Sequence, residues 1–86
     1  MPRISAFYGI AIWMYYDDHS PPHFHATYAE HEAVVEIATR RVLHGSLPAR
    51  AQRLVDEWAA EHEADLARDW ERARGGRPLL PIEPLR

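Results

Sequence analysis

The fold is decided by residues 23–37, HFHATYAEHEAVVEI, where apolar and polar side chains alternate on both sides of a short connection. In a strand, every second side chain points to the same face. The apolar side chains of the first half share one face: Phe24, Ala26 and Tyr28. The polar ones share the other: His23, His25 and Thr27. After Ala29–His31, the alternation resumes, with Ala33, Val35 and Ile37 opposite Glu32, Val34 and Glu36. The pattern predicts two strands joined as a hairpin.

The preceding residues predict further strands. Residues 4–16 are rich in β-branched and aromatic side chains, and Gly9 marks a turn, so two strands are expected here. One face of the second strand carries Ile10, Ile12, Met14 and Tyr16. Pro21-Pro22 forbids continued pairing, because proline has no amide hydrogen. Residues 17–22 are therefore expected to form a loop.

The residues after the hairpin change from strand to helix patterns. Residues 42–44 predict a short edge strand, and Ser46-Leu47-Pro48 predicts a helix start, with Ser46 as its cap. Apolar side chains then recur at helical spacing: Leu47, Ala51, Leu54, Val55, Trp58, His62, Leu66, Trp70 and Ala73. The pattern fits one helix, or two with a break near residues 62–65. Residues 77–86 contain three prolines and predict an extended, docked tail.

Strands followed by helices, without strand-helix-strand alternation, predict the α+β class. We expect an antiparallel sheet of three to five strands (residues 4–44) and one long or two consecutive C-terminal helices (residues 47–74) on one face. The buried side chains are expected to include Leu54, Val55, Trp58, Leu66 and Trp70. At 86 residues, the chain 1–86 is expected to be a single domain.

Composition excludes several classes of function. The chain has no cysteine, which excludes disulfides, thiolate zinc sites and thiol nucleophiles. Its net charge of −3 argues against indiscriminate phosphate binding, although nucleic acid as a partner stays open. No apolar run has the length of a signal peptide or a membrane span, so we expect a cytoplasmic protein without membrane contact.

Candidate chemistry is concentrated in one short segment. Three of the six histidines lie within seven residues, next to two carboxylates: Asp17, Asp18, His19, His23 and His25. Residues i and i+2 of a strand point the same way, about 6–7 Å apart. We expect His23 and His25 to project from the face opposite Phe24, with Asp17, Asp18 or His19 within hydrogen-bonding reach of one ring.

Two chemistries suit this arrangement. Without any cofactor, His23 and His25 would act as acid and base, Asp18 would orient one imidazole, and Arg41 would stabilise a phosphoryl transition state. This is the logic of a small metal-free ribonuclease. In the alternative, His19, His23 and His25, or two imidazoles and a carboxylate, bind a divalent transition metal ion.

A purely structural role is also open, since such histidines can hydrogen-bond loop carbonyls and cap a strand. Trp13 and Tyr15 lie on the strand face opposite Ile12. If helices cover the Ile12 face, the two aromatics are expected to be exposed and to bind a partner, together with Asp17 and His19. A homodimer through a strand edge or sheet face is a further expectation.

The chain resembles the small prokaryotic family called domain of unknown function 4160. The most specific part of the resemblance is D-H-x-P-P-H-F-H-A, residues 18–26, and it departs from the usual pattern at Ser20 and at Arg40-Arg41. Further segments carry it: Ile4-Ser5, Phe7-Tyr8-Gly9-Ile10, Met14-Tyr15-Tyr16-Asp17, Glu32-Ala33, Leu47-Pro48 and Glu57-Trp58.

This resemblance implies a bacterial two-component module of the toxin-antitoxin type. The leading hypothesis is accordingly a toxin-side component, in its enzyme form a metal-free ribonuclease, with a cognate small protein partner and RNA as substrate. The alternatives are a non-catalytic protein-binding module and a histidine-based metal-binding protein.

Overall fold

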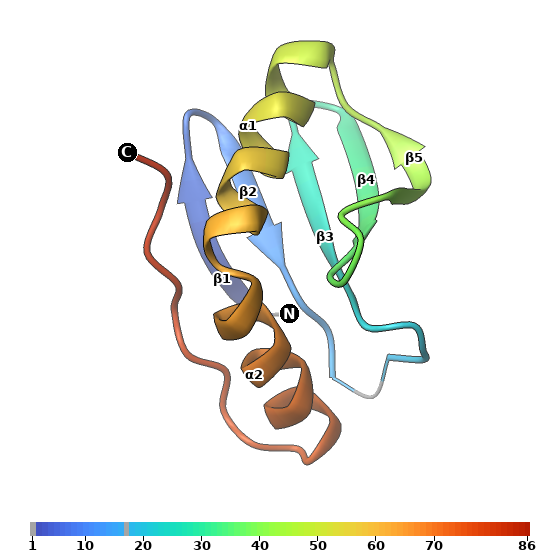
Figure 1. Cartoon of the computed structure of the whole chain (residues 1–86), viewed down its shortest axis with the longest axis vertical. Coiled ribbons are helices and arrows are strands. Elements are labelled where there is room, and N and C mark those ends of the chain that lie inside the picture. Colours follow the sequence, from blue (N-terminus) through green and yellow to red (C-terminus); the bar gives the residue numbers. More distant parts are fainter. Residues whose placement is uncertain (1, 17) are drawn as a thin grey trace.

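The computed structural model describes residues 2–16 and 18–86, which form a five-stranded sheet with two helices over one face (Figure 1). The elements are β1 (Arg3–Phe7), β2 (Ile10–Trp13), β3 (His23–Tyr28), β4 (His31–Glu36), β5 (Val42–Ser46), α1 (Ala49–Glu61) and α2 (Glu63–Arg74). Neighbouring strands are antiparallel and follow the order β1-β2-β3-β4-β5. The predicted α+β class is confirmed.

The core lies between the sheet and the helices, because the apolar side of each alternating strand faces them. Trp58 of α1 is fully buried, and its ring lies 5.4 Å from the Phe7 ring and 5.8 Å from the Phe24 ring, measured between centroids. The other large, fully buried apolar side chains are Ile10, Ile12, Met14, Val35, Val55 and Leu66. Leu54 is only half-buried, although it was predicted to be buried.

Two expectations at the ends of elements are wrong. The sequence predicts Tyr16 on the same strand face as Ile12, but β2 ends at Trp13 and the Tyr16 side chain is exposed. Ser46 was expected to cap a helix, but it is the last residue of β5, and Pro48 takes the position before α1. Pairing extends past His44 because Gly45 has a positive φ of 75° and no Cβ; a Cβ there would collide with the main-chain oxygen of Glu32.

The helical segment is divided at His62, which lies between α1 and α2. The His62 amide donates to the Trp58 and Ala59 oxygens, at 3.1 and 3.3 Å, so the last turn of α1 tightens before α2 begins. The sequence left open one long helix or two helices with a break, and the structure has two helices.

The C-terminal tail is docked on the body of the protein, as predicted, and it lies beside β1 (Figure 1). It is held by the Leu80 amide, which donates to Asp69 (3.0 Å), the Ile82 amide, which donates to the Ile4 oxygen (2.7 Å), and the Glu83 oxygen, which accepts from Trp58 (2.8 Å). The tail thus covers one sheet edge, whereas every residue of β5 at the other edge is exposed. None of the helices in the described ranges is long and apolar enough to cross a membrane.

Candidate metal centre

His23 and His25 are separated by one residue on β3 and turn their rings to the same side, with ring centroids 5.3 Å apart. Phe24, between them, points to the opposite side and packs against Trp58. Because the core takes the Phe24 ring, strand alternation places both imidazoles on the other face of β3. The predicted shared face is confirmed.

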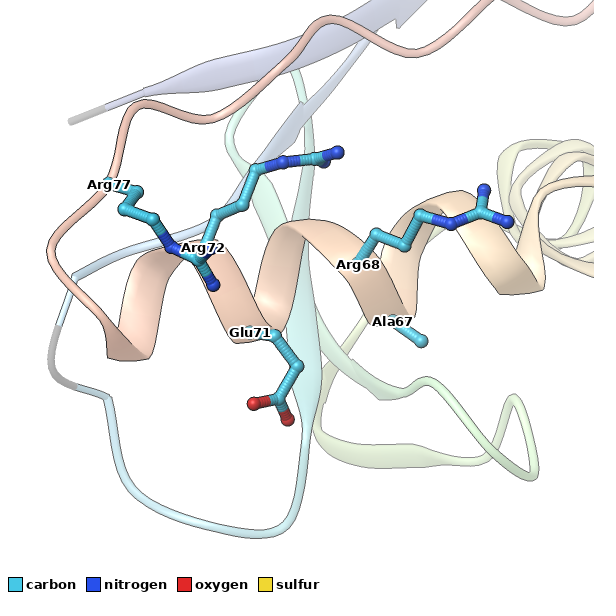
Figure 2. A pocket seen from close by; sticks show the side chains of 5 residues that line it. All are labelled: Ala67, Arg68, Glu71, Arg72 and Arg77. Carbon is cyan, nitrogen blue, oxygen red and sulfur yellow. The ribbon is translucent and has the colours of Figure 1, made fainter.

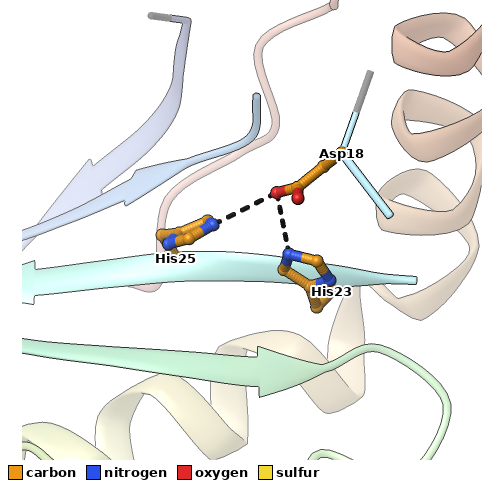
Figure 3. A group of neighbouring side chains, drawn as sticks. All are labelled: Asp18, His23 and His25. Carbon is orange, nitrogen blue, oxygen red and sulfur yellow. Dashed lines mark hydrogen bonds and ion pairs between the residues drawn. The ribbon is translucent and has the colours of Figure 1, made fainter. Parts of the chain in front are cut away.

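The loop before β3 brings Asp18 over this pair of imidazoles (Figure 3). Asp18 Oδ2 lies 2.8 Å from His23 Nε2 and 3.4 Å from His25 Nε2. The three candidate ligand atoms all lie within 4.8 Å of one another. One carboxylate oxygen therefore faces the same nitrogen of both rings, as the prediction of a carboxylate within reach required.

The other ring nitrogens also face oxygen atoms. His23 Nδ1 lies 2.7 Å from the Pro21 carbonyl oxygen, and His25 Nδ1 lies 3.3 Å from Glu32 Oε2. A carbonyl oxygen can only accept a hydrogen bond, so Nδ1 of His23 carries a proton and donates it. Nε2 of His23 must then either carry a second proton or direct its lone pair to a cation.

Burial differs among the three side chains. His23 is 5% exposed, and its ring centroid lies 5.1 Å from that of Trp70 in α2. The side chains of Asp18 and His25 are about one-sixth exposed, at 17% and 15%. The cluster is thus open to solvent on the side of Asp18 and His25, and closed on the side of His23.

The electrostatics favour the charged form of Asp18. Burial alone would raise the pKa of the Asp18 carboxyl, but hydrogen bonds from the His19 amide and from the His23 and His25 rings lower it below its ordinary value. Burial raises the pKa of the Tyr15 phenol, and the nearby carboxylates of Glu32 and Asp18 raise it further. Tyr15 therefore keeps its proton, while Asp18 offers a carboxylate.

A lowered pKa of Asp18 in the folded state predicts an acid-dependent loss of stability. The folded protein binds fewer protons at Asp18 than the unfolded chain does, so this stabilisation is fully present above the unfolded pKa, about 3.9, and is lost as pH falls through the lower folded pKa. In thermal unfolding with a chelator present, the stability advantage of the natural protein over Asp18→Asn should shrink as the pH falls below about 4. An advantage that stays undiminished as the pH falls from about 4 to about 2 would contradict this assignment.

Two predicted site residues, His19 and Arg41, lie outside the cluster of ligand atoms. His19 is adjacent, with Nδ1 3.3 Å from the other Asp18 oxygen, but its side chain is 92% exposed. The main-chain oxygen of Arg41 accepts from the Glu36 amide, and no hydrogen bond or ion pair within residues 2–16 and 18–86 joins its guanidinium to the cluster. Asp17 lies outside the described residues.

Trp13 and Tyr15 are half-buried, so the expectation of two exposed aromatics is wrong. Trp13 Nε1 donates to Thr27 Oγ1 on the neighbouring strand at 2.9 Å. The Tyr15 ring packs edge-on against the His25 ring, with centroids 4.3 Å apart. Trp13 lies opposite His25 in the pairing of β2 with β3, so both aromatics lie beside the histidines.

The sequence reasoning missed Glu32, Trp70 and the Pro21 oxygen as neighbours of the two imidazoles. A signal for Glu32 was available, because the short hairpin connection places it on the same sheet face as His25. Trp70 comes from a helix far along the chain, and neither strand nor helix periodicity relates it to His23.

A second group of polar side chains lines a hollow on α2: Arg68, Glu71, Arg72 and Arg77, with Ala67. Two of these arginines are already paired, Arg72 with Asp69 at 2.7 Å and Arg68 with Asp65 at 3.2 Å. Figure 2 shows the side chains of Arg68 and Arg77 pointing in different directions. The arginines therefore do not converge on one anion site.

Comparison with known proteins agrees with the motif in residues 18–26. The model of the family described as domain of unknown function (DUF4160) matches residues 9–71, and the chain belongs to this family. The matched region contains Asp18, His23, His25 and Glu32. No curated protein and no solved structure matches the chain.

Proposed function

We propose that Asp18, His23 and His25 bind one divalent transition metal ion through Asp18 Oδ2 and the two Nε2 atoms. The observation that carries the proposal is the convergence of both Nε2 atoms on a single carboxylate oxygen while both Nδ1 atoms face oxygen acceptors. Metal-binding histidines in proteins have this second interaction at the far nitrogen, which fixes the ring and its tautomer.

The distances are close to those of a coordination shell. Ligands about 2.0–2.1 Å from zinc in a tetrahedron lie about 3.3 Å from one another. The Asp18-His25 separation of 3.4 Å already fits, and the Asp18-His23 separation of 2.8 Å needs to open by about half an ångström. The two Nε2 atoms lie within 4.8 Å of each other, so binding would require small movements of the imidazoles as well as of the Asp18 carboxylate.

The donor set indicates the kind of ion and the kind of site. Two imidazoles and one carboxylate suit zinc, nickel, cobalt or iron better than calcium or magnesium, which prefer oxygen ligands alone. Three protein ligands leave a position for water or a substrate, as in catalytic zinc sites, and a metal-bound water is a hydrolytic nucleophile near neutral pH. Hydrolysis is therefore the chemistry that this site would support.

A second candidate is the metal-free ribonuclease, with His23 and His25 as acid and base. The short contact between His23 and Asp18 supports it, because a carboxylate beside an imidazole is a common way to orient a general base. Two features count against it: Asp18 occupies Nε2 of both rings, and the Arg41 guanidinium makes no contact with them. With either chemistry, we propose that the protein is the toxin-side component of a two-component module. This part of the proposal rests on the family resemblance alone.

Metal uptake tests the proposal. Chelator-treated protein should take up one equivalent of Zn²⁺, Ni²⁺ or Co²⁺, and His23→Ala or Asp18→Ala should weaken that affinity at least about a hundredfold, because two ligands hold such an ion poorly. His44→Ala is the matched control, since His44 is an exposed histidine on β5 outside the cluster. Trp70, beside His23, gives a fluorescence signal that paramagnetic ions should quench.

Failure of stoichiometric uptake, or an equal loss in His44→Ala, would contradict the metal centre and leave the metal-free candidate. The same variants address the toxin-side role. Induced expression of the natural protein should arrest bacterial growth, and folded His23→Ala should not. Equal growth with both proteins would count against a toxin, whichever chemistry the site performs.

A further inference from the structure

We infer that Glu32 is a positioning residue for the metal centre, which holds the His25 ring so that Nε2 points to Asp18. This inference rests on the metal-binding function proposed above. Glu32 Oε2 lies 3.3 Å from His25 Nδ1, and Asp18 Oδ2 lies 3.4 Å from His25 Nε2, so the imidazole is held at both nitrogens.

The sheet register brings Glu32 to this place. In the pairing of β3 with β4, His25 lies opposite Val34 and Thr27 lies opposite Glu32. Glu32 is therefore the diagonal neighbour of His25 on the same face, within reach of a long side chain. A slip of one residue in the register would move Glu32 to the helix-covered face, so the hairpin itself determines this contact.

The two histidines differ in how they are anchored. His23 is buried, and its Nδ1 donates to a main-chain carbonyl that no side-chain substitution removes. His25 is more exposed, and its Nδ1 depends on the side chain of Glu32. The Tyr15 ring packs edge-on against the His25 ring, with centroids 4.3 Å apart, and Glu32 is the residue that faces Nδ1. Loss of Glu32 should therefore free one ligand and leave the other in place.

This arrangement is the carboxylate-histidine-metal pattern, in which the outer carboxylate selects the tautomer of the ligand. With Nδ1 protonated and donating to Glu32, the Nε2 lone pair is available to the ion. Removal of such an outer partner generally weakens metal affinity by about 10- to 100-fold. Because the Glu32 side chain is 54% exposed, we expect the lower end of that range, about tenfold.

The experiment compares Co²⁺ and Zn²⁺ affinities of the full chain and three variants. Glu32→Ala should weaken binding about tenfold, and Glu32→Gln should stay within about threefold, because its amide oxygen still accepts from Nδ1. Glu30→Ala is the matched control: Glu30 is an exposed carboxylate of the same hairpin that contacts His31, and its loss should change nothing. The visible absorption of bound Co²⁺ should change shape in Glu32→Ala only, since the geometry at His25 changes.

Nitrogen chemical shifts of His25 in the zinc-bound protein give a second readout that needs no variant, and should show Nδ1 protonated and Nε2 coordinated. Coordination through Nδ1 would overturn the inference. So would equal affinities of Glu32→Gln and Glu32→Ala, which would assign the effect to charge alone. An unchanged affinity in Glu32→Ala overturns the role of Glu32 but leaves the metal centre standing, whereas absence of metal binding by the natural protein overturns both.

Discussion

Replacing Trp58 by alanine should strongly destabilise the protein. The side chain is fully buried and lies against the rings of Phe7, Phe24 and His62, with centroid separations of 5.4, 5.8 and 5.6 Å. Truncating a buried tryptophan to alanine costs about 3–5 kcal/mol, and a chain of this length has a total stability of roughly 4–13 kcal/mol. One cavity therefore removes much of the stability.

The indole of Trp58 also donates to the Glu83 oxygen, which links the core to the tail. Trp58→Phe should keep most of the packing but lose this hydrogen bond, so its loss of stability should be intermediate. Urea unfolding followed by circular dichroism measures all of these values. Leu80→Ala provides the control, since the Leu80 side chain is half exposed, and it should change stability by less than about 1 kcal/mol. A Trp58→Ala protein as stable as this control would refute the packing argument.

The strands and the β3-β4 hairpin were accessible from sequence because they depend on local patterns. Period-two alternation identified the strand His23–Tyr28 with its correct ends, and the short connection after it identified the hairpin with β4. The buried Trp58 and Trp70 followed from helical spacing. Each of these features needs only residues that are close together in the chain.

The end of β5 and the start of α1 were not accessible, because two local signals compete there. Ser46-Leu47-Pro48 is a good helix start, yet pairing with β4 continues through Gly45 to Ser46. What decides the outcome is the close approach of Gly45 to the Glu32 main chain, a contact between two separate strands. The helix and strand propensities of a few neighbouring residues do not reveal this contact between strands.

Some features of the candidate site could likewise be predicted from the sequence, and others could not. The shared face of His23 and His25 follows from strand geometry, and the Pro21-Pro22 corner kept the preceding carboxylates near. The half-buried state of Trp13 could not be predicted from the sequence, because it depends on a hydrogen bond to Thr27 on the neighbouring strand. The packing of Trp70 on His23 likewise depends on where α2 crosses the end of the sheet.

Asp69 is a further residue that no sequence pattern indicated, and it controls the tail. Its side chain is fully buried in α2, although aspartate rarely is. Asp69 Oδ1 accepts from Arg72 at 2.7 Å and from the Leu80 amide at 3.0 Å, while Oδ2 has no hydrogen-bond partner among the described residues. The carboxyl group thus joins the last turns of α2 to the start of the tail.

Asp69→Ala should destabilise the protein by about 2–4 kcal/mol, because it leaves the Arg72 guanidinium and the Leu80 amide without this acceptor. The value lies below that of a fully buried pair, since Arg72 is partly exposed and water can reach it. Asp69→Asn should cost less than half as much, as its amide oxygen can accept both hydrogen bonds. Hydrogen exchange at Leu80 and Ile82 should accelerate in Asp69→Ala before global unfolding, because the tail is released first.

Asp65→Ala is the control on the same helix: Asp65 is half exposed and pairs with Arg68, so its loss should cost no more than about 1 kcal/mol. If the two alanine variants lose the same stability and leave tail exchange unchanged, Asp69 does not hold the tail.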